Sequence, residues 1–363
     1  MPPLRSVPDD LGSASAPVTA PPPPRVRRDG GQPLYQQVCD QIEALALSAE
    51  LGDERPLPPE GQLIGRFGVS RGTLRRATDE LARRGLLRIE PGRGTFVVQA
   101  TKVRWLVWDR LLGVARPDSR FDLDLSRFVP DFAGRERCDD QLRSLPGYRE
   151  AETVFLAPDN SLETMRRYAL DDGKTILVPS YGLRRGLVLL DPAALGGRAD
   201  HRLAATLDGM EQLGRRLSLN EVRGLAAVDL VVSGAVAVTR RGLHFGGGDG
   251  FFDLEWGLLR HCGLVTSKTP VVVVAHDCQV LDADIRPGPH DAVADTVITP
   301  GAGVTACAPP LPKPDGIFWA EIRTAWAGSG IPYVRELIAE LDPDPVLTAP
   351  ARPRWREHDG AGR

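Results

Sequence analysis

Three short runs of almost unbroken apolar residues lie in the second half of the chain: KTILVP at 174–179, VDLVVSG at 228–234 and TPVVVVAHD at 269–277. Strands that are covered on both faces have this pattern, because neither face contacts water. Helical stretches lie between the runs, notably at 160–171 and 200–216. The pattern predicts an α/β domain with a mainly parallel sheet over residues 101–340.

The residues before this domain follow a different pattern. Apolar residues at helical spacing predict an amphipathic helix over 33–49, and a second short helix ends near Gly68. Ser70 is placed to cap a third helix that reaches about Gly85. LLRIE and TFVV, separated by PGRG, then predict a hairpin. Three helices and a hairpin over residues 31–100 are typical of a winged helix-turn-helix.

Composition and cysteine spacing limit the classes of protein to which this chain can belong. Residues 1–30 contain PPPP and predict a disordered extension, and the Pro- and Arg-rich residues 341–363 predict a flexible tail. The first residues have no apolar signal segment, and no run approaches the ~18 apolar residues that span a bilayer. Five scattered cysteines without a CxxC pair argue against a disulfide framework or a structural zinc site. We therefore expect a cytoplasmic protein without a membrane partner.

Positive charge is concentrated in the predicted third helix and hairpin. Residues 66–93 hold eight arginines and three acidic residues, whereas the whole chain has a net charge of -3. Arginines at the start of a helix reach phosphates or guanine edges when that helix enters the major groove of double-stranded DNA. The alternative is a solvated helix face. The expected DNA-binding residues are Ser70, Arg71, Thr73, Arg75, Arg76, Arg93 and Gly94.

The segments PLYQQVCDQI, LPPEGQLIGRFGVSRGTLRRATDELARRGLL and PGRGTFV together resemble the GntR family of bacterial regulators over residues 33–98. The resemblance implies a symmetric DNA operator that is read by two copies of the module, and therefore a homodimer. Gly61 stands where the family usually has an arginine that contacts DNA. One expected DNA contact is therefore absent.

A glycine-rich segment, GLHFGGGDGFFDLEW at 242–256, is the most informative part of the larger domain. Glycines at 246, 247, 248 and 250 leave the backbone N–H groups open to a close approach by phosphate oxygens. Taken alone, such a glycine-rich turn after a strand is more often only a tight connection.

Other segments accompany it in a fixed order: RFVPDFAGRERC, PDNSLETMR, DGKTILVPSYGLRRG, HDCQV, ITP and KPDGIFW. Together they resemble the 5-formyltetrahydrofolate cyclo-ligase family, also called methenyltetrahydrofolate synthetase, over most of residues 102–340. The resemblance implies a fold of the NagB/RpiA/CoA-transferase-like type. It also implies ATP and Mg²⁺ as cofactors, with a reduced folate converted to 5,10-methenyltetrahydrofolate.

Site residues follow from the motif positions of this resemblance. The nucleotide-binding set is Arg104, Arg166, Gly246, Gly248 and Gly250. The catalytic set is Asp253, His290, Asp291 and Asp295, with Asp253 also expected to hold the metal. Lys174, His276 and Gln279 flank buried strands, and for these the alternative is that they only satisfy backbone groups.

Several positions depart from the family pattern. Gly247 and His244 stand where such loops generally carry a lysine and a basic residue, and Asp249 adds negative charge. Phe251 and Phe252 replace a pair of tyrosines. We therefore expect a DNA-binding regulator whose larger domain binds a nucleotide or a folate. An active ATP-dependent cyclo-ligase is the second hypothesis, and a dimerisation scaffold without a ligand is the third.

Overall fold

The computed structural model divides the chain into two compact units, residues 1–102 and 103–363. The residues that the structure describes are 26, 31–47, 56–83, 86–98, 103, 107–108, 110–117, 128–247, 250–283, 285, 287–316 and 330–341. The predicted N-terminal extension, apart from Val26, and the predicted tail beyond Leu341 lie outside these residues. Among the described residues, no helix has the length and apolar character needed to cross a membrane.

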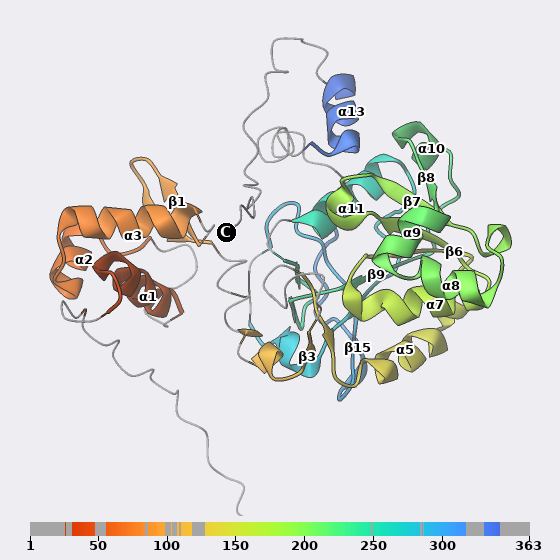
Figure 1. Ribbon diagram of the computed structural model, residues 1–363, viewed down its shortest axis with the longest axis horizontal. Helices are drawn as coiled ribbons and strands as arrows, with labels where there is room; N and C mark the ends of the chain where they lie inside the picture. The colour runs from red at the N-terminus through yellow and green to blue at the C-terminus, as the bar shows by residue number, and fades with distance from the viewer. Residues whose placement is uncertain are drawn as a thin grey trace, which may run out of the picture. The chain divides into compact units, whose positions relative to one another are not determined.

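The first unit consists of three helices followed by a two-stranded antiparallel sheet (Figure 1). Its elements are α1 (Leu34–Leu47), α2 (Glu60–Phe67), α3 (Arg71–Arg83), β1 (Leu87–Glu90) and β2 (Gly94–Val97). Val38 and Ile42 from α1 are buried together with Leu74 and Leu81 from α3. The helical spacing of these side chains brings them to one face of each helix, as the sequence predicts. The winged helix-turn-helix is confirmed.

Gly68 makes the sharp turn between α2 and α3. It has a φ of 68°, in the left-handed region that a side chain disfavours, and its N–H donates to the carbonyl of Ile64 at 2.9 Å. Two residues later Ser70 caps α3, because its Oγ accepts a hydrogen bond from the N–H of Thr73 at 3.2 Å. The turn and cap fix where the arginine-bearing helix begins.

An eight-stranded sheet forms the centre of the second unit, in the order β15-β14-β12-β9-β5-β6-β7-β8. The strands are β5 (Thr153–Leu156), β6 (Thr175–Pro179), β7 (Leu187–Leu190), β8 (Arg215–Arg216), β9 (Leu230–Gly234), β12 (Val271–Val274), β14 (Thr296–Thr299) and β15 (Gly303–Ala306). The five strands from β14 to β6 are parallel, while β15, β7 and β8 pair antiparallel at the edges. The α/β architecture is confirmed, with a mixed sheet whose parallel part is central.

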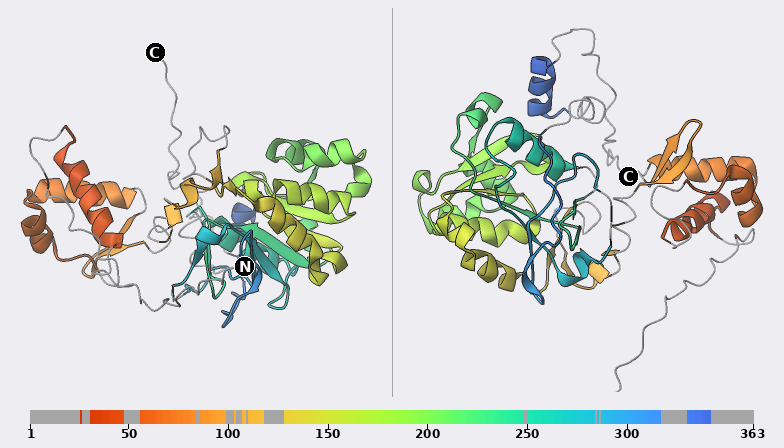
Figure 2. Two further views of the ribbon diagram at one scale, coloured as in Figure 1. Left: turned by 90° about the horizontal axis from the view of Figure 1, so that it is seen from below. Right: turned by 180° about the vertical axis from the view of Figure 1, so that it is seen from behind.

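Helices and small strands complete this unit. The helices whose bounds the structure describes are α5 (Arg135–Ser144), α6 (Pro146–Glu150), α7 (Glu163–Asp171), α8 (Arg198–Ala204), α9 (Leu207–Leu213), α10 (Leu219–Arg223), α11 (Phe251–His261) and α13 (Pro332–Leu341). Two further strand groups are β3 (Ala115–Arg116) with β4 (Asp131–Phe132), and β10 (Ala237–Thr239) with β11 (His244–Phe245) and β13 (Val280–Leu281). Helices α7, α8 and α9 lie together near β6 and β7 (Figures 1 and 2). The single helical stretch predicted at 200–216 consists of two short helices, α8 and α9, and the short strand β8 follows them.

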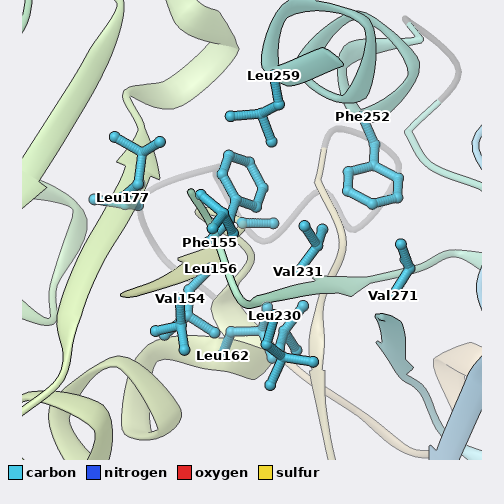
Figure 3. Packing of buried hydrophobic residues seen from close by; sticks show 14 of the residues in the cluster. Val154, Phe155, Leu156, Leu162, Leu177, Leu230, Val231, Phe252, Leu259 and Val271 are labelled. Atoms are coloured by element: carbon cyan, nitrogen blue, oxygen red, sulfur yellow. The ribbon is translucent and has the colours of Figure 1, made fainter. Parts of the chain in front are cut away.

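The parallel strands are buried on both faces, which explains their unbroken apolar sequence. In Figure 3, Phe155 of β5 points toward Leu259 of α11, whereas Val154 lies on the opposite side, near Leu162. All four side chains are 1% exposed or less. Successive residues of a strand point to opposite faces, so a strand between two helical layers needs apolar residues at every position.

The order of the parallel strands reverses between β5 and β9. After β5 the chain adds β6 on one side, and it later returns to place β9 on the other side. In sheets of this kind, ligands bind outside the carboxyl ends of the strands at the point of reversal. For this chain, that point lies beside Ala157 and Gly234.

Candidate functional site

The DNA-facing candidates of the first unit are exposed at the start of α3. Arg71 and Arg75 have side chains that are 68% and 65% exposed. Nε of Arg75 donates to Oε1 of Glu60 at 2.8 Å, and Nε of Arg71 lies 3.6 Å from Oε2 of the same residue. Glu60 from α2 therefore holds both guanidinium groups side by side, a positioning contact that the sequence did not reveal.

Arg76 is positioned by a different contact. Its guanidinium carbon lies 4.0 Å from the centre of the Tyr35 ring, which comes from α1. A guanidinium over an aromatic face is held by the ring quadrupole and by stacking. The hydroxyls of Ser70 and Thr73 lie 2.9 Å apart at the same helix end. The two hydroxyls lie at the same end of α3 as the candidate arginines.

The hairpin tip carries the remaining candidates. Arg93 is 75% exposed, and its Nη1 lies 2.6 Å from Oε2 of Glu90. Gly94 has a φ of 129°, and a Cβ there would lie 2.9 Å from Cβ of Pro56, so the close approach of the two chain segments requires glycine. Gly61 on α2 is exposed, and a Cβ added there would meet nothing within 4 Å.

A pocket lies at the point of strand reversal in the second unit. Its volume is about 100 Å³, and about 720 Å³ when the space of the open mouth is included. The wall comes from the segments after β5 and β6, from the end of β9, from β11 and from the start of α11. The lining residues are Phe128, Val129, Ala157, Pro158, Asp159, Asn160, Tyr181, Gly182, Ser233, Gly234, His244, Gly246, Gly247, Phe251, Phe252 and Glu255.

Asp159 is the first of two carboxyl groups in this wall. Its Oδ2 accepts a hydrogen bond from the N–H of Gly234 at 2.7 Å and lies 3.5 Å from Oγ of Ser233. Burial raises the pKa of Asp159 to about 6, against the opposing effects of the Gly234 hydrogen bond and the nearby charge of Arg166. The carboxyl group therefore ties the end of β5 to the end of β9.

Glu255 is the second carboxyl group. It lies on α11 and is only 4% exposed. Burial raises its pKa well above the ordinary value, and the neighbouring charges of Asp159 and Asp253 add to this effect. The structure gives its carboxyl group no hydrogen-bond partner among the described residues.

His244 closes the pocket from β11. It is 6% exposed, and its Nε2 lies 2.8 Å from the carbonyl oxygen of Gly234. Burial lowers the pKa of His244 to about 4, so the ring is neutral at pH 7 and its Nε2–H donates to that carbonyl. The ring centre lies 4.6 Å from that of Phe252. The side chain contributes an aromatic wall and no positive charge.

Arg166 was expected to offer positive charge to a nucleotide. The structure buries it completely on α7. Its guanidinium donates to the carbonyls of Ala157 at 2.8 Å, Asp159 at 3.1 Å and Ala205 at 2.8 Å. In this geometry Arg166 shapes the segment that follows β5, and it is not among the residues that line the pocket.

The expected catalytic residues are used mainly within the fold. Oδ1 of Asp253 accepts from the N–H of Ala292 at 2.7 Å, which ties α11 to the segment around residue 292. Asp291 accepts from the N–H of Gly288 at 2.8 Å. Asp295 accepts from the N–H of Val271 at 2.7 Å and pairs with Lys313.

His290 is half-buried and, like Asp253, Asp291 and Asp295, does not line the pocket. The described residues contain no group of three or more His, Cys, Asp or Glu side chains that could hold a metal ion. The metal role expected for Asp253 therefore stays a prediction.

The glycine segment is described only in part. Gly246 lines the pocket, and Gly250 begins α11 with a φ of 70°. Gly248, Asp249 and Arg104 lie outside the described residues.

Lys174, His276 and Gln279 satisfy backbone groups. Nζ of Lys174 donates to the carbonyl of Ala151 at 2.6 Å. Nε2 of Gln279 donates to the carbonyl of Ala235 at 2.5 Å, and its Oε1 accepts from the N–H of His276 at 2.6 Å. These contacts agree with the alternative that the three residues only satisfy backbone groups.

The sequence pattern did not single out Asp159, Ser233 or Glu255. Ser233 lies near the end of a predicted strand, so its position carried a usable signal once the strand order was known. Asp159 follows β5, which the sequence pattern did not single out. Glu255 stands in the segment DLEW, beside the more conspicuous glycines. A carboxyl group on the buried face of an otherwise apolar helix is the signal that could have found it.

Both units are similar to known protein families. The profile of the 5-formyltetrahydrofolate cyclo-ligase family matches residues 101–300, and that of the gntR family of bacterial regulatory proteins matches residues 34–97. The methenyltetrahydrofolate synthase domain-containing protein of Bos taurus is 32% identical over 251 residues, which cover 69% of this chain and 63% of that protein. This chain thus spans less than two thirds of the length of that relative.

Two further proteins are similar to single units. The HTH-type transcriptional repressor NagR of Bacillus subtilis is 42% identical over 65 residues, which cover 18% of this chain and 27% of that protein. The NMR structure of Aquifex aeolicus 5,10-methenyltetrahydrofolate synthetase has 21% identity and a TM-score of 0.38, over 59% of this chain and 95% of that one. Because the cyclo-ligase profile matches more than half of its 363 residues, this chain belongs to the 5-formyltetrahydrofolate cyclo-ligase family, with a gntR-family helix-turn-helix domain at residues 34–97.

Proposed function

We propose that this protein is a transcriptional regulator that binds double-stranded DNA through its gntR-family domain. The observation that carries the proposal is the row of exposed arginines at the start of α3, in a chain whose net charge is -3. Glu60 holds Arg71 and Arg75 side by side, which lowers the entropy that the two side chains lose when they contact DNA. The helix then reads the major groove, and Arg93 in the wing reaches the adjacent groove.

The same proposal implies that two copies of the domain bind one symmetric operator. Helix-turn-helix regulators bind two half-sites as dimers, and the symmetry of the operator mirrors the two-fold symmetry of the dimer. The protein therefore acts as a homodimer. Arg76 contributes from its position over Tyr35, and Ser70, Thr73 and Gly94 lie beside the phosphate backbone.

The cyclo-ligase-family domain is the proposed sensor. Its pocket lies at the strand reversal, where ligands of such sheets bind, and a nucleotide or a reduced folate is the ligand class that family membership suggests. A ligand that binds one conformation better than another by 1–3 kcal/mol changes DNA affinity by about 5- to 150-fold. Ligand binding then sets how much of the operator is occupied.

ATP with Mg²⁺ fits the described pocket poorly. The described lining residues include no lysine or arginine, whereas phosphoryl transfer needs cations around the transferring group. Asp159 and Glu255 instead place two carboxyl groups in the wall. The described pocket therefore supports no catalytic step through ATP.

A working cyclo-ligase remains the second candidate, and the match of the family profile to residues 101–300 favours it. The test is ATP- and Mg²⁺-dependent formation of 5,10-methenyltetrahydrofolate by the full chain, followed by absorbance. The regulator proposal expects no turnover above a buffer control. Turnover that disappears when ATP is omitted would establish the enzyme.

The regulator proposal is tested with DNA. Duplexes selected from a random pool by the full chain provide the probe, and fluorescence anisotropy measures the affinity with and without 5-formyltetrahydrofolate or ATP and Mg²⁺. We expect selective binding, at least a tenfold loss with Arg75→Ala, and at least a fivefold change in affinity with one of the ligands. Arg149→Ala, an exposed arginine of the second unit, is the matched control and retains affinity. Absence of selective binding refutes the DNA-binding half, and equal affinity with every ligand refutes the sensor half.

A further inference from the structure

The loop between β6 and β7, residues 180–186, forms part of the pocket wall and has an unfavourable backbone conformation. We call it the pocket loop, because Tyr181 and Gly182 line the pocket. Gly182 has a φ of 61° and Leu183 has a φ of 53°. Leu183 is the one residue other than glycine with a positive φ in the described part of the chain. A side chain disfavours this region, so such a conformation persists only where the surroundings determine it.

The first part of the pocket loop contacts α11 and is closed by its own hydrogen bonds. A Cβ on Gly182 would lie 3.3 Å from the ring of Phe251. Oγ of Ser180 accepts a hydrogen bond from the N–H of Arg185 at 2.9 Å and donates one to the carbonyl of Gly186 at 3.0 Å. These contacts shape the turn, but they do not tie its last residue to the rest of the domain.

The last residue of the pocket loop contacts α13. Gly186 has a φ of 77°, and a Cβ there would lie 2.6 Å from Cζ of Tyr333, so the tyrosine ring lies directly on the loop backbone. The Tyr333 hydroxyl accepts from the N–H of Leu187 at 3.0 Å and donates to the carbonyl of Leu217 at 2.5 Å. This buried side chain therefore joins the end of the loop to the start of β7 and to the residue that follows β8.

The C-terminal end of α13 is fastened at a different place. Nη1 and Nη2 of Arg223 on α10 donate to the two carboxylate oxygens of Glu340 at 3.0 and 2.6 Å. Between the two ends of the helix, Val334 and Leu337 are fully buried. The helix lies after residues 101–300, the segment that the cyclo-ligase profile matches. One helix thus connects α10 to the wall of the pocket.

We propose that α13 is a latch that holds the pocket loop in its strained conformation, and that release of α13 loosens the pocket wall. The inference rests on the sensor pocket of the proposed function and adds a way to regulate it. A strained loop relaxes to a second conformation when one of its supports is withdrawn. Because coupling between two sites is reciprocal, a ligand that packs against Tyr181 in the latched form also stabilises the docking of α13.

Hydrogen exchange of the full chain without ligand tests the latch. The reporter is the N–H of Arg185, because its partner is Ser180 and its exchange therefore reports relaxation of the loop rather than a lost bond to the tyrosine. Tyr333→Phe keeps the ring and removes the hydroxyl. It should accelerate exchange of Arg185 at least fivefold and leave β5 and β9 within twofold of the wild type. Tyr148→Phe, which removes another buried tyrosine hydroxyl, is the matched control and should leave the loop unchanged.

Glu340→Gln is the decisive variant, because it acts from the end of α13 that is fastened to α10. It removes the ion pair with Arg223 and changes no residue of the pocket loop. An exposed ion pair contributes little to stability, so we expect exchange of Arg185 to accelerate about two- to threefold. Glu336→Gln, on an exposed position of the same helix, is the matched control and should behave like the wild type. If Tyr333→Phe does not fold, Glu340→Gln decides the inference alone.

Unchanged exchange of Arg185 in Glu340→Gln overturns the inference. An equal acceleration in the loop and in β5 and β9 also overturns it, because that pattern reports a general loss of stability. The measurement is then repeated with 5-formyltetrahydrofolate as the probe, and the latch predicts that the pocket loop and α13 are protected together. Protection of the loop alone contradicts the latch. No protection anywhere in the chain refutes folate sensing and leaves the latch to the result without ligand.

Discussion

Replacing Asp159 by asparagine should stabilise the second unit at alkaline pH. Asp159 ties the end of β5 to that of β9 through the N–H of Gly234, at 2.7 Å. An asparagine carbonyl accepts the same hydrogen bond and carries no charge. The substitution therefore imitates the protonated form of Asp159 and makes that form permanent at every pH.

The magnitude follows from the raised pKa. The pKa of Asp159 is about 6 in the folded protein against an ordinary value of 3.8. The folded state therefore keeps a proton that the unfolded state releases, and the stability of the wild type falls as the pH rises through the window between these values. A difference of about two pKa units corresponds to about 3 kcal/mol at pH 8. The stability gained by Asp159→Asn should grow from a few tenths of a kcal/mol near pH 4 to about 3 kcal/mol at pH 8.

Urea unfolding followed by tryptophan fluorescence measures this difference. All six tryptophans of the chain lie after residue 102, so the signal reports the second unit and not the first. Asp140→Asn, on the exposed face of α5, is the matched control and should leave the pH dependence unchanged. A stability difference between Asp159→Asn and wild type that stays constant from pH 4 to pH 8 would refute the reasoning.

Three further substitutions have defined outcomes. Gly61→Arg should increase affinity for the selected duplex in an anisotropy titration, because a side chain on this exposed position of α2 meets nothing within 4 Å; unchanged affinity would show that the position does not face DNA. Gly234→Ala should cost about 1–3 kcal/mol in urea unfolding, since its Cβ would lie 2.8 Å from Oγ of Ser161 and 2.9 Å from Oδ2 of Asp159. Arg166→Met should cost about 3 kcal/mol or more in the same assay, because it leaves three backbone carbonyls without their donor; a neutral effect would contradict its structural role.

The sequence predicted the first unit almost element by element. Its helices are amphipathic, so apolar spacing reports both the helix and the face that it buries, and Gly68 and Ser70 mark where one helix ends and the next begins. Three of the parallel strands of the second unit, β6, β9 and β12, were visible as apolar runs, whereas β5 and β14 were not singled out. The edge strand β8 was not visible, because it is only two residues long and both of its residues are exposed.

The pocket was harder to predict for a physical reason. Gly246 was found because glycine-rich turns are conspicuous, whereas Asp159 and Glu255 meet only through the order of the strands. That order is a long-range property, and local pattern does not contain it. Arg166 lies near a motif, which suggested a ligand contact; the structure shows its guanidinium donating to backbone carbonyls, and the nucleotide contact stays a prediction.

The salt dependence of DNA binding tests the central claim most directly. Each neutralised phosphate contributes a slope of about -0.9 to log affinity against log salt concentration, so Arg71, Arg75, Arg76 and Arg93 in two copies predict a slope of about -7 for the full chain on its selected duplex. Arg75→Ala should reduce this slope by about 2. A slope near zero, or one that Arg75→Ala leaves unchanged, would contradict the account.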